Sequence, residues 1–122
     1  MKIDIATRTP IWIALSELYL DTELQDADYK TIARTIIESA YTIDEVKKIN
    51  KYEVFPVLYQ NLLSAAGVWN GFDKEWLVAE IIKSINKRTQ LKTLSMAAAF
   101  ATQKSQFKEA WKKIEKNLDS IP

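Results

Sequence analysis

The sequence predicts an all-α protein: a single helical domain over residues 1–122, built as a bundle of about six to seven helices. Three observations lead to this class. Apolar residues recur at the three- and four-residue spacing of amphipathic helices, and no segment alternates polar and apolar residues for long enough to form a strand. The chain also has only 2 glycines and 3 prolines, so few positions favour turns. A chain of this length is expected to bury one core without disulfide bonds.

The N-terminal helix is expected to begin with Thr9 as its N-cap and Pro10 in its first turn, where a proline costs no hydrogen bond. Its apolar residues point in most directions, which predicts a central helix; they are Ile11, Trp12, Leu15, Leu18 and Tyr19. Asp26 or Asp28 is then placed to cap a second helix. That helix has an amphipathic stripe of Tyr29, Ile32, Ala33, Ile36, Ile37 and Ala40.

A third helix is predicted from the capping box at residues 42–45, Thr-Ile-Asp-Glu. We expect it to stop at residues 52–55, because Pro56 disfavours helical geometry in the residue before it and is tolerated only in a first turn. A fourth helix would begin at Pro56 and end at Gly67, in the position of a left-handed C-cap.

Asp73 is expected to cap a fifth helix that runs to about Asn86. The remaining residues have a narrow apolar stripe followed by a firmer one. This change predicts two further helices, which separate between Thr102 and Ser105.

The absence of histidine and cysteine limits the chemistry that this chain can perform. It removes the side chain whose pKa lies nearest neutrality, the thiol nucleophile and the usual transition-metal ligands. We therefore expect no catalytic residue, no metal ion and no cofactor. A carboxylate enzyme based on Glu17 and Asp21 remains an alternative, because these two residues share one helix face. A calcium loop starting at Asp21 is excluded, since Asp26 stands where glycine is required.

Charge is unevenly distributed along the sequence, although the net charge is only +1. Residues 1–82 carry 13 acidic and 8 basic side chains, whereas residues 83–122 carry 3 and 9. The two parts thus have net charges of −5 and +6. How the helices fold back decides whether this asymmetry also exists in space.

The acidic side chains concentrate in one segment, whose members are Glu17, Asp21, Glu23, Asp26 and Asp28. We predict that this acidic segment binds a partner protein. A solvated helix end with N-caps is the simpler interpretation, and a metal or catalytic site is a third.

Tryptophans provide the second candidate for partner binding. Trp12, Trp76 and Trp111 lie at helical spacing and are expected in the core. Trp69 lies beside the Asn-Gly turn at residues 70–71, where a partly exposed side chain would serve as an anchor for a partner.

An alternative basic surface is predicted near the C-terminus, formed by Lys104, Lys108, Lys112, Lys113 and Lys116. Phe107 and Trp111 lie on the neighbouring helix face. This basic surface suits a solvated helix face, or an acidic protein or a second subunit. Nucleic acid is the least favoured partner, because the charges are lysines without a reading arginine.

The sequence predicts a cytoplasmic protein without membrane contact. Asp4 and Arg8 interrupt the apolar residues of the N-terminus, which therefore lacks the apolar core of a secretory signal. No stretch is apolar for the roughly 18 residues that a membrane span needs.

Three segments carry a resemblance to known proteins: TPIWIALSELYLDTEL at residues 9–24, EVFPVL and NLL within residues 53–63, and AGVWNGFD at residues 66–73. Together they resemble a family of small bacterial proteins known only as a domain of unknown function. The resemblance covers roughly residues 8–82. It implies a bacterial origin and a helical fold, and brings no established catalytic residues.

More loosely, the chain resembles bacterial immunity proteins, which neutralise a cognate toxin, in its size and in its lack of cysteine. This resemblance implies a non-enzymatic protein whose partner is a toxin domain. The alternative function is a helical adaptor or regulatory domain that binds an acidic protein or nucleic acid through its basic C-terminal helix.

Overall fold

The computed structural model describes residues 3–63 and 70–121, and within these residues it contains helices and no strand. In chain order the helices are α1 (Ile5–Ser16), η1 (Glu17–Tyr19), α2 (Asp26–Glu38), α3 (Ile43–Ile49), η2 (Asn50–Val54), α4 (Phe55–Leu63), α5 (Lys74–Lys87) and α6 (Gln90–Ser120). The predicted all-α class is confirmed. Helices α3, η2 and α4 follow one another without a break, and η1 directly continues α1. The described residues therefore form five continuous helical segments, fewer than the six to seven helices expected.

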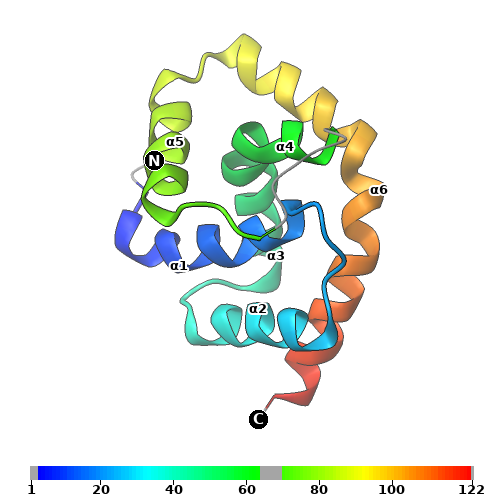
Figure 1. The fold of residues 1–122 in the computed structure, drawn as a ribbon. Coiled ribbons are helices and arrows are strands. Elements are labelled where there is room, and N and C mark those ends of the chain that lie inside the picture. Colours follow the sequence, from blue (N-terminus) through cyan, green and yellow to red (C-terminus); the bar gives the residue numbers. More distant parts are fainter. Residues whose placement is uncertain (1–2, 64–69, 122) are drawn as a thin grey trace.

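Helix α1 lies at the centre of the arrangement (Figure 1). It packs against α2, α5 and η2, and α2 in turn packs most extensively against α6. Figure 1 shows α6 crossing the top of the view and then descending along one side to the C-terminus. The segments with opposite net charge therefore do not form opposite ends of the molecule, because α2 and α6 are direct neighbours.

Helix α1 begins earlier than the sequence predicted. Asp4 is its N-cap and accepts a hydrogen bond from the backbone N–H of Thr7 at 3.2 Å. Pro10 consequently lies inside the helix, and the prediction of Thr9 as the N-cap was wrong. Thr9 instead donates its hydroxyl to the carbonyl of Ile5 at 2.7 Å, a bond that a threonine within a helix commonly makes.

The expected break before Pro56 is replaced by a π-helical turn, η2, through which the chain passes from α3 into α4. A proline has no N–H for the carbonyl four residues earlier, which belongs to Tyr52. The guanidinium of Arg88 donates a hydrogen bond to this carbonyl. A wider turn and a donor from a distant residue thus accommodate Pro56 within a continuous helical segment.

The predicted separation of two C-terminal helices is also wrong, since α6 is a single helix of 31 residues. Neither glycine nor proline occurs within it. Thr102, in the predicted break, donates its hydroxyl to the carbonyl of Ala99 at 2.7 Å, a type of bond that often bends helices. The apolar stripe changes because the helix first lies exposed, with Leu91 78% and Leu94 65% exposed, and then packs on the core through Phe107 and Ile114.

Several predicted helix starts are confirmed. Thr42 and Glu45 form the capping box of α3: the Thr42 N–H donates to the Glu45 carboxylate at 2.9 Å, and the Glu45 N–H donates to the Thr42 hydroxyl at 3.2 Å. Asp73 caps α5 by accepting from the Trp76 N–H at 2.8 Å. At α2 the prediction of Asp26 or Asp28 as the N-cap was wrong, because the N-cap is Gln25. Asp28 lies in the first turn and accepts a hydrogen bond from the Gln25 N–H at 2.8 Å.

All α-helices contribute to the hydrophobic core, whose fully buried members include Ile11, Trp12, Leu15, Val46, Phe55, Leu77, Ile81 and Ile114. Trp12 is buried as predicted, and Trp111 packs partly buried against the core. Trp76 is 46% exposed, so its predicted place in the core was wrong. It lies in the first turn of α5, and Leu77 and Ile81 occupy the buried face of this helix instead.

Two polar groups on η2 are buried within this core. Glu53 accepts two hydrogen bonds from the Arg8 guanidinium, at 2.9 and 3.1 Å, and a third from the indole N–H of Trp12 at 2.8 Å. Asn50 accepts from the hydroxyl of Tyr19 at 2.6 Å. Burial raises the pKa of Tyr19 well above its ordinary value, so the phenol remains a hydrogen-bond donor.

Candidate partner-binding surfaces

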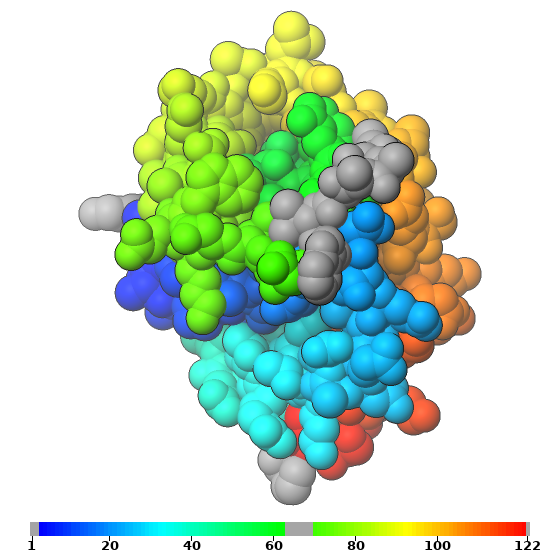
Figure 2. All heavy atoms as spheres, viewed as in Figure 1, coloured from blue at the N-terminus to red at the C-terminus, as the bar shows by residue number. Residues whose placement is uncertain are grey.

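The predicted acidic segment lies on the surface, over η1, the following connection and the start of α2. All five of its carboxylates are exposed. Figure 2 shows the chain after η1 and the start of α2, in light blue, open on the face in view. Three ion pairs form among the described residues, and none of them involves this segment. The acidic charge here is therefore uncompensated by an ion pair within that part of the chain.

Two of the five acidic residues, Glu17 and Asp28, line the same cavity. Glu17 and Asp28 border a hollow of about 320 Å³ between α1 and α2, whose other lining residues include Pro10, Ile13 and Thr31. Asp21, Glu23 and Asp26 lie outside it. Asp28 also serves the helix start, as described above, so the N-cap interpretation accounts for part of its role.

The surroundings of Glu17 raise the pKa of its carboxyl group. Partial burial of the carboxyl group against the protein is the larger cause, and the negative charge of Asp28 raises the pKa further. The positive charge of Lys74 lowers the pKa by a smaller contribution. The sequence spacing suggested that the carboxylates of Glu17 and Asp21 lie close together. In the fold, the carboxylate that acts on Glu17 is that of Asp28 on α2.

We expect Glu17→Gln to alter how stability depends on pH. A carboxyl group whose pKa is raised in the folded state favours folding below its unfolded pKa, and this contribution is lost as pH rises through the folded pKa. Thermal unfolding should therefore show the variant gaining stability relative to the wild type as pH rises from 4 towards neutrality. An NMR titration of Glu17 should give a midpoint above 4.5 that falls in Asp28→Asn. A midpoint unchanged by Asp28→Asn would contradict this electrostatic account.

The predicted basic surface is divided by the fold. Lys104 and Lys108 line one groove, whereas Lys113 lies on the side of α2, its ammonium 5.2 Å from the ring centre of Tyr29. Lys112 is outside the groove and pairs with Glu109 at 3.5 Å, and Lys116 is also outside it. The five lysines are all exposed, but they do not form one continuous site.

The opposite wall of this groove carries three lysines that the sequence analysis missed: Lys47, Lys48 and Lys51. They come from α3 and η2, where Val46, Ile49 and Asn50 face the core. The sequence contained a signal for this second basic wall, because three lysines within five residues of an amphipathic helix lie on the side away from the core. Their meeting with α6 depended on tertiary packing, which the spacing alone does not reveal.

We call this site the lysine groove: Lys47, Lys48 and Lys51 on one wall, Lys104, Ser105 and Lys108 on the other, and Phe100, Phe107 and Trp111 in the floor. Its volume is about 580 Å³, within the range of ligand-binding pockets. The Lys47 ammonium lies 5.8 Å from a ring centre of Trp111, and that of Lys51 lies 5.7 Å from the ring centre of Phe100. The groove thus combines positive charge with an apolar floor.

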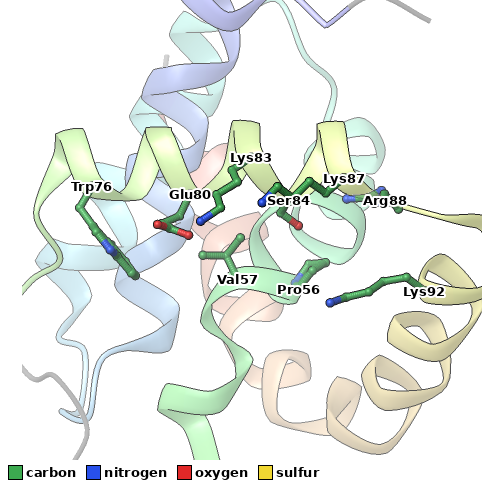
Figure 3. A pocket seen from close by; sticks show the side chains of 9 residues that line it. All are labelled: Pro56, Val57, Trp76, Glu80, Lys83, Ser84, Lys87, Arg88 and Lys92. Atoms are coloured by element: carbon green, nitrogen blue, oxygen red, sulfur yellow. The ribbon is translucent and has the colours of Figure 1, made fainter.

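A smaller basic hollow lies between α4, α5 and the start of α6 (Figure 3). Its volume is about 280 Å³, and its cations are Lys83, Lys87, Arg88 and Lys92. Figure 3 shows Lys92 reaching from α6 towards Pro56 and Trp76 lying at the opposite end of the hollow. Glu80 places a negative charge within it, and Arg88 is already bonded to the carbonyl of Tyr52, so fewer cations are free for a ligand.

Two further predictions from the sequence concern Trp69 as an anchor for a partner and a metal site built from carboxylates. Trp69, together with the C-cap position at Gly67, lies outside the described residues. Within the described residues, no group of three or more acidic side chains is arranged to hold a metal ion. In the same part of the chain no helix is long and apolar enough to cross a membrane.

Comparison with known proteins finds one family. A family model described as "Domain of unknown function (DUF7079)" matches residues 6–117. The match extends beyond the resemblance at residues 8–82 and includes most of α6 with its basic residues. No curated protein and no solved structure matches the chain.

Proposed function

This chain belongs to the family described as "Domain of unknown function (DUF7079)", and we propose that it is a non-enzymatic protein that acts by binding another protein. In its most concrete form, it is a cytoplasmic immunity protein that neutralises a cognate bacterial toxin by direct contact. The acidic segment, which is exposed and forms no ion pair within the described part of the chain, is the observation that carries this proposal.

The acidic segment suits a basic toxin surface, such as the substrate-binding face of a nuclease. Complementary charges raise the association rate and reject partners of like charge. The hollow between α1 and α2 adds a place where a basic side chain of the toxin would lie between Glu17 and Asp28. An immunity protein of this kind covers the toxin's active site or its substrate surface and needs no catalytic residue of its own.

The proposal predicts a toxin-like gene beside the gene of this chain, and the experiment measures binding of the purified chain to the product of that gene. We expect the triple variant Asp21→Asn, Glu23→Gln, Asp26→Asn to slow association about tenfold or more at low salt. The matched control is Glu38→Gln, Asp44→Asn, Glu75→Gln, which removes the same charge from exposed positions elsewhere. Equal slowing in both variants would contradict a role for the acidic segment. The absence of such a gene, or no binding to its product, would contradict the immunity function.

A helical adaptor or regulatory domain is the second candidate function, and the lysine groove favours it. In that case the partner is acidic, and the triple variant in the acidic segment binds it as well as the wild type does. The two candidates thus differ in which variant weakens binding.

A further inference from the structure

The lysine groove carries more positive charge than its surroundings neutralise. Of its five lysines, Lys47 pairs with a carboxylate, that of Glu115 at 3.2 Å. Neither of the other two ion pairs among the described residues involves a groove lysine. Because the lysines stand on both walls, their fields add over the floor and attract a negatively charged ligand.

The floor of the groove is apolar, and its rings already contact one another. Phe100 and Phe107 are stacked with their ring centres 5.7 Å apart, and the ring of Phe55 packs against both in T-shaped geometry. Phe107 is only 2% exposed. Trp111 has Lys47 near one ring face. The floor therefore offers a cavity for an inserted side chain, rather than free ring faces.

This distinction bears on the class of ligand. Single-stranded nucleic acid binds such grooves by stacking successive bases on exposed aromatic faces, and the phosphate charge then follows the backbone. Here Phe107 is buried, Phe100 stacks on it with Lys51 near its ring, and Trp111 has Lys47 near its ring. A protein segment that alternates carboxylates with a large apolar side chain fits both parts of the site, since carboxylates reach the rim lysines while the apolar side chain enters the cavity.

We propose that the lysine groove between α3–η2 and α6 binds an acidic segment of a partner protein, anchored by one aromatic or large aliphatic side chain. The site is separate from the acidic segment on which the toxin-binding proposal depends. Its charge is opposite, so a single surface of one partner cannot be complementary to both. Failure of either proposal leaves the other intact.

The probe is a short fluorescein-labelled peptide with glutamates on both sides of one central tryptophan, measured by fluorescence polarisation. Two matched peptides accompany it: one has glutamine in place of glutamate, and the other has alanine in place of tryptophan. We expect the full peptide to bind, both matched peptides to bind at least about tenfold more weakly, and added salt to weaken the binding. A labelled single-stranded DNA of equal charge should bind more weakly than the peptide.

Variants on one helix locate the site. Lys104→Gln with Lys108→Gln removes two charges from the groove, and Lys112→Gln with Lys116→Gln removes two exposed charges at the same spacing outside it. We expect about a tenfold loss of peptide affinity in the first pair and less than about twofold in the second. All four substituted positions are exposed, and melting curves check that both variants fold.

Four outcomes would overturn the proposal. Equal loss of affinity in the two variant pairs would show that the peptide responds to overall charge and not to the groove. Full binding of the alanine peptide would show that no apolar side chain anchors it. Tighter binding of the DNA would assign the groove to nucleic acid. Self-association of the wild type at low salt that is abolished by the groove variant would assign it to a second copy of this chain.

Discussion

Phe55→Ala is expected to lower the free energy of unfolding by about 4 kcal/mol, the largest loss that we predict for one substitution. Phe55 is fully buried at the start of α4. Its ring lies 5.3 Å from that of Tyr59 and 5.0 Å from that of Phe100, measured between ring centres. Truncation removes apolar surface from the core and leaves a cavity between α4 and α6, because the Phe55 ring packs against Phe100 and Phe107 of α6.

Urea unfolding followed by far-ultraviolet circular dichroism measures this loss, with Leu94→Ala as the control. Leu94 is 65% exposed on α6, so its truncation should cost less than about 0.5 kcal/mol. Phe55→Leu, which keeps most of the volume, should cost about 1 kcal/mol and gives a measurable value if the alanine variant does not fold. Similar losses for Phe55→Ala and Leu94→Ala would contradict the central position of Phe55.

Glu53→Gln should destabilise the protein by about 3 kcal/mol, because it leaves a buried guanidinium without its counter-charge. The Glu53 side chain is 9% exposed and that of Arg8 is 16% exposed. Glutamine keeps the size of the side chain and can still accept from the indole of Trp12. The loss should lie at the lower end of the range for broken buried pairs, since Arg8 also lies 4.8 Å from the ring centre of Tyr41 and keeps some contact with water.

Glu109→Gln is the matched control for Glu53→Gln. It makes the same chemical change in the exposed ion pair with Lys112, where the side chains are 72% and 62% exposed. Water already screens this pair, so the change should cost less than about 0.5 kcal/mol. A loss for Glu53→Gln as small as that of the control, in the same urea unfolding experiment, would contradict a structural role for the buried ion pair.

Local sequence signals predicted the fold class and several helix starts correctly. The capping box at residues 42–45 and the N-cap at Asp73 depend on contacts within one turn, and the structure contains both. The stripe of α2 was also largely right, with Ile32, Ala33 and Ile36 buried. Ile37 is 44% exposed, because α2 turns a narrower face to the core than its stripe suggests.

The helix boundaries that failed depend on distant residues. The carbonyl of Tyr52, which Pro56 deprives of its α-helical donor, bonds to Arg88, a residue 36 positions later in the chain. The continuity of α6 follows from the absence of a helix-breaking residue, whereas the change in its stripe reflects which half meets the core. The spacing of apolar residues reflects which residues are buried. A change from an exposed half to a core-facing half of one helix was therefore interpreted as a boundary between two helices.

The candidate surfaces were predictable in composition but not in assembly. Charge counting identified the acidic segment and the lysines of α6. It could not pair Glu17 with Asp28, nor bring Lys47, Lys48 and Lys51 opposite Lys104 and Lys108, because these residues meet only through the packing of α1 on α2 and of η2 on α6. The asymmetry of charge along the sequence was real, yet the fold places its two parts side by side.

The central proposal is that this protein protects by binding, and co-expression tests it most directly. The proposal requires a toxin-like gene beside the gene of this chain. The product of such a gene would be produced in cells alone, with the wild-type chain, or with the triple variant Asp21→Asn, Glu23→Gln, Asp26→Asn. We predict that the wild type restores growth, whereas the triple variant restores it less well than the control Glu38→Gln, Asp44→Asn, Glu75→Gln. Growth inhibited equally with and without the wild-type chain would contradict the proposal.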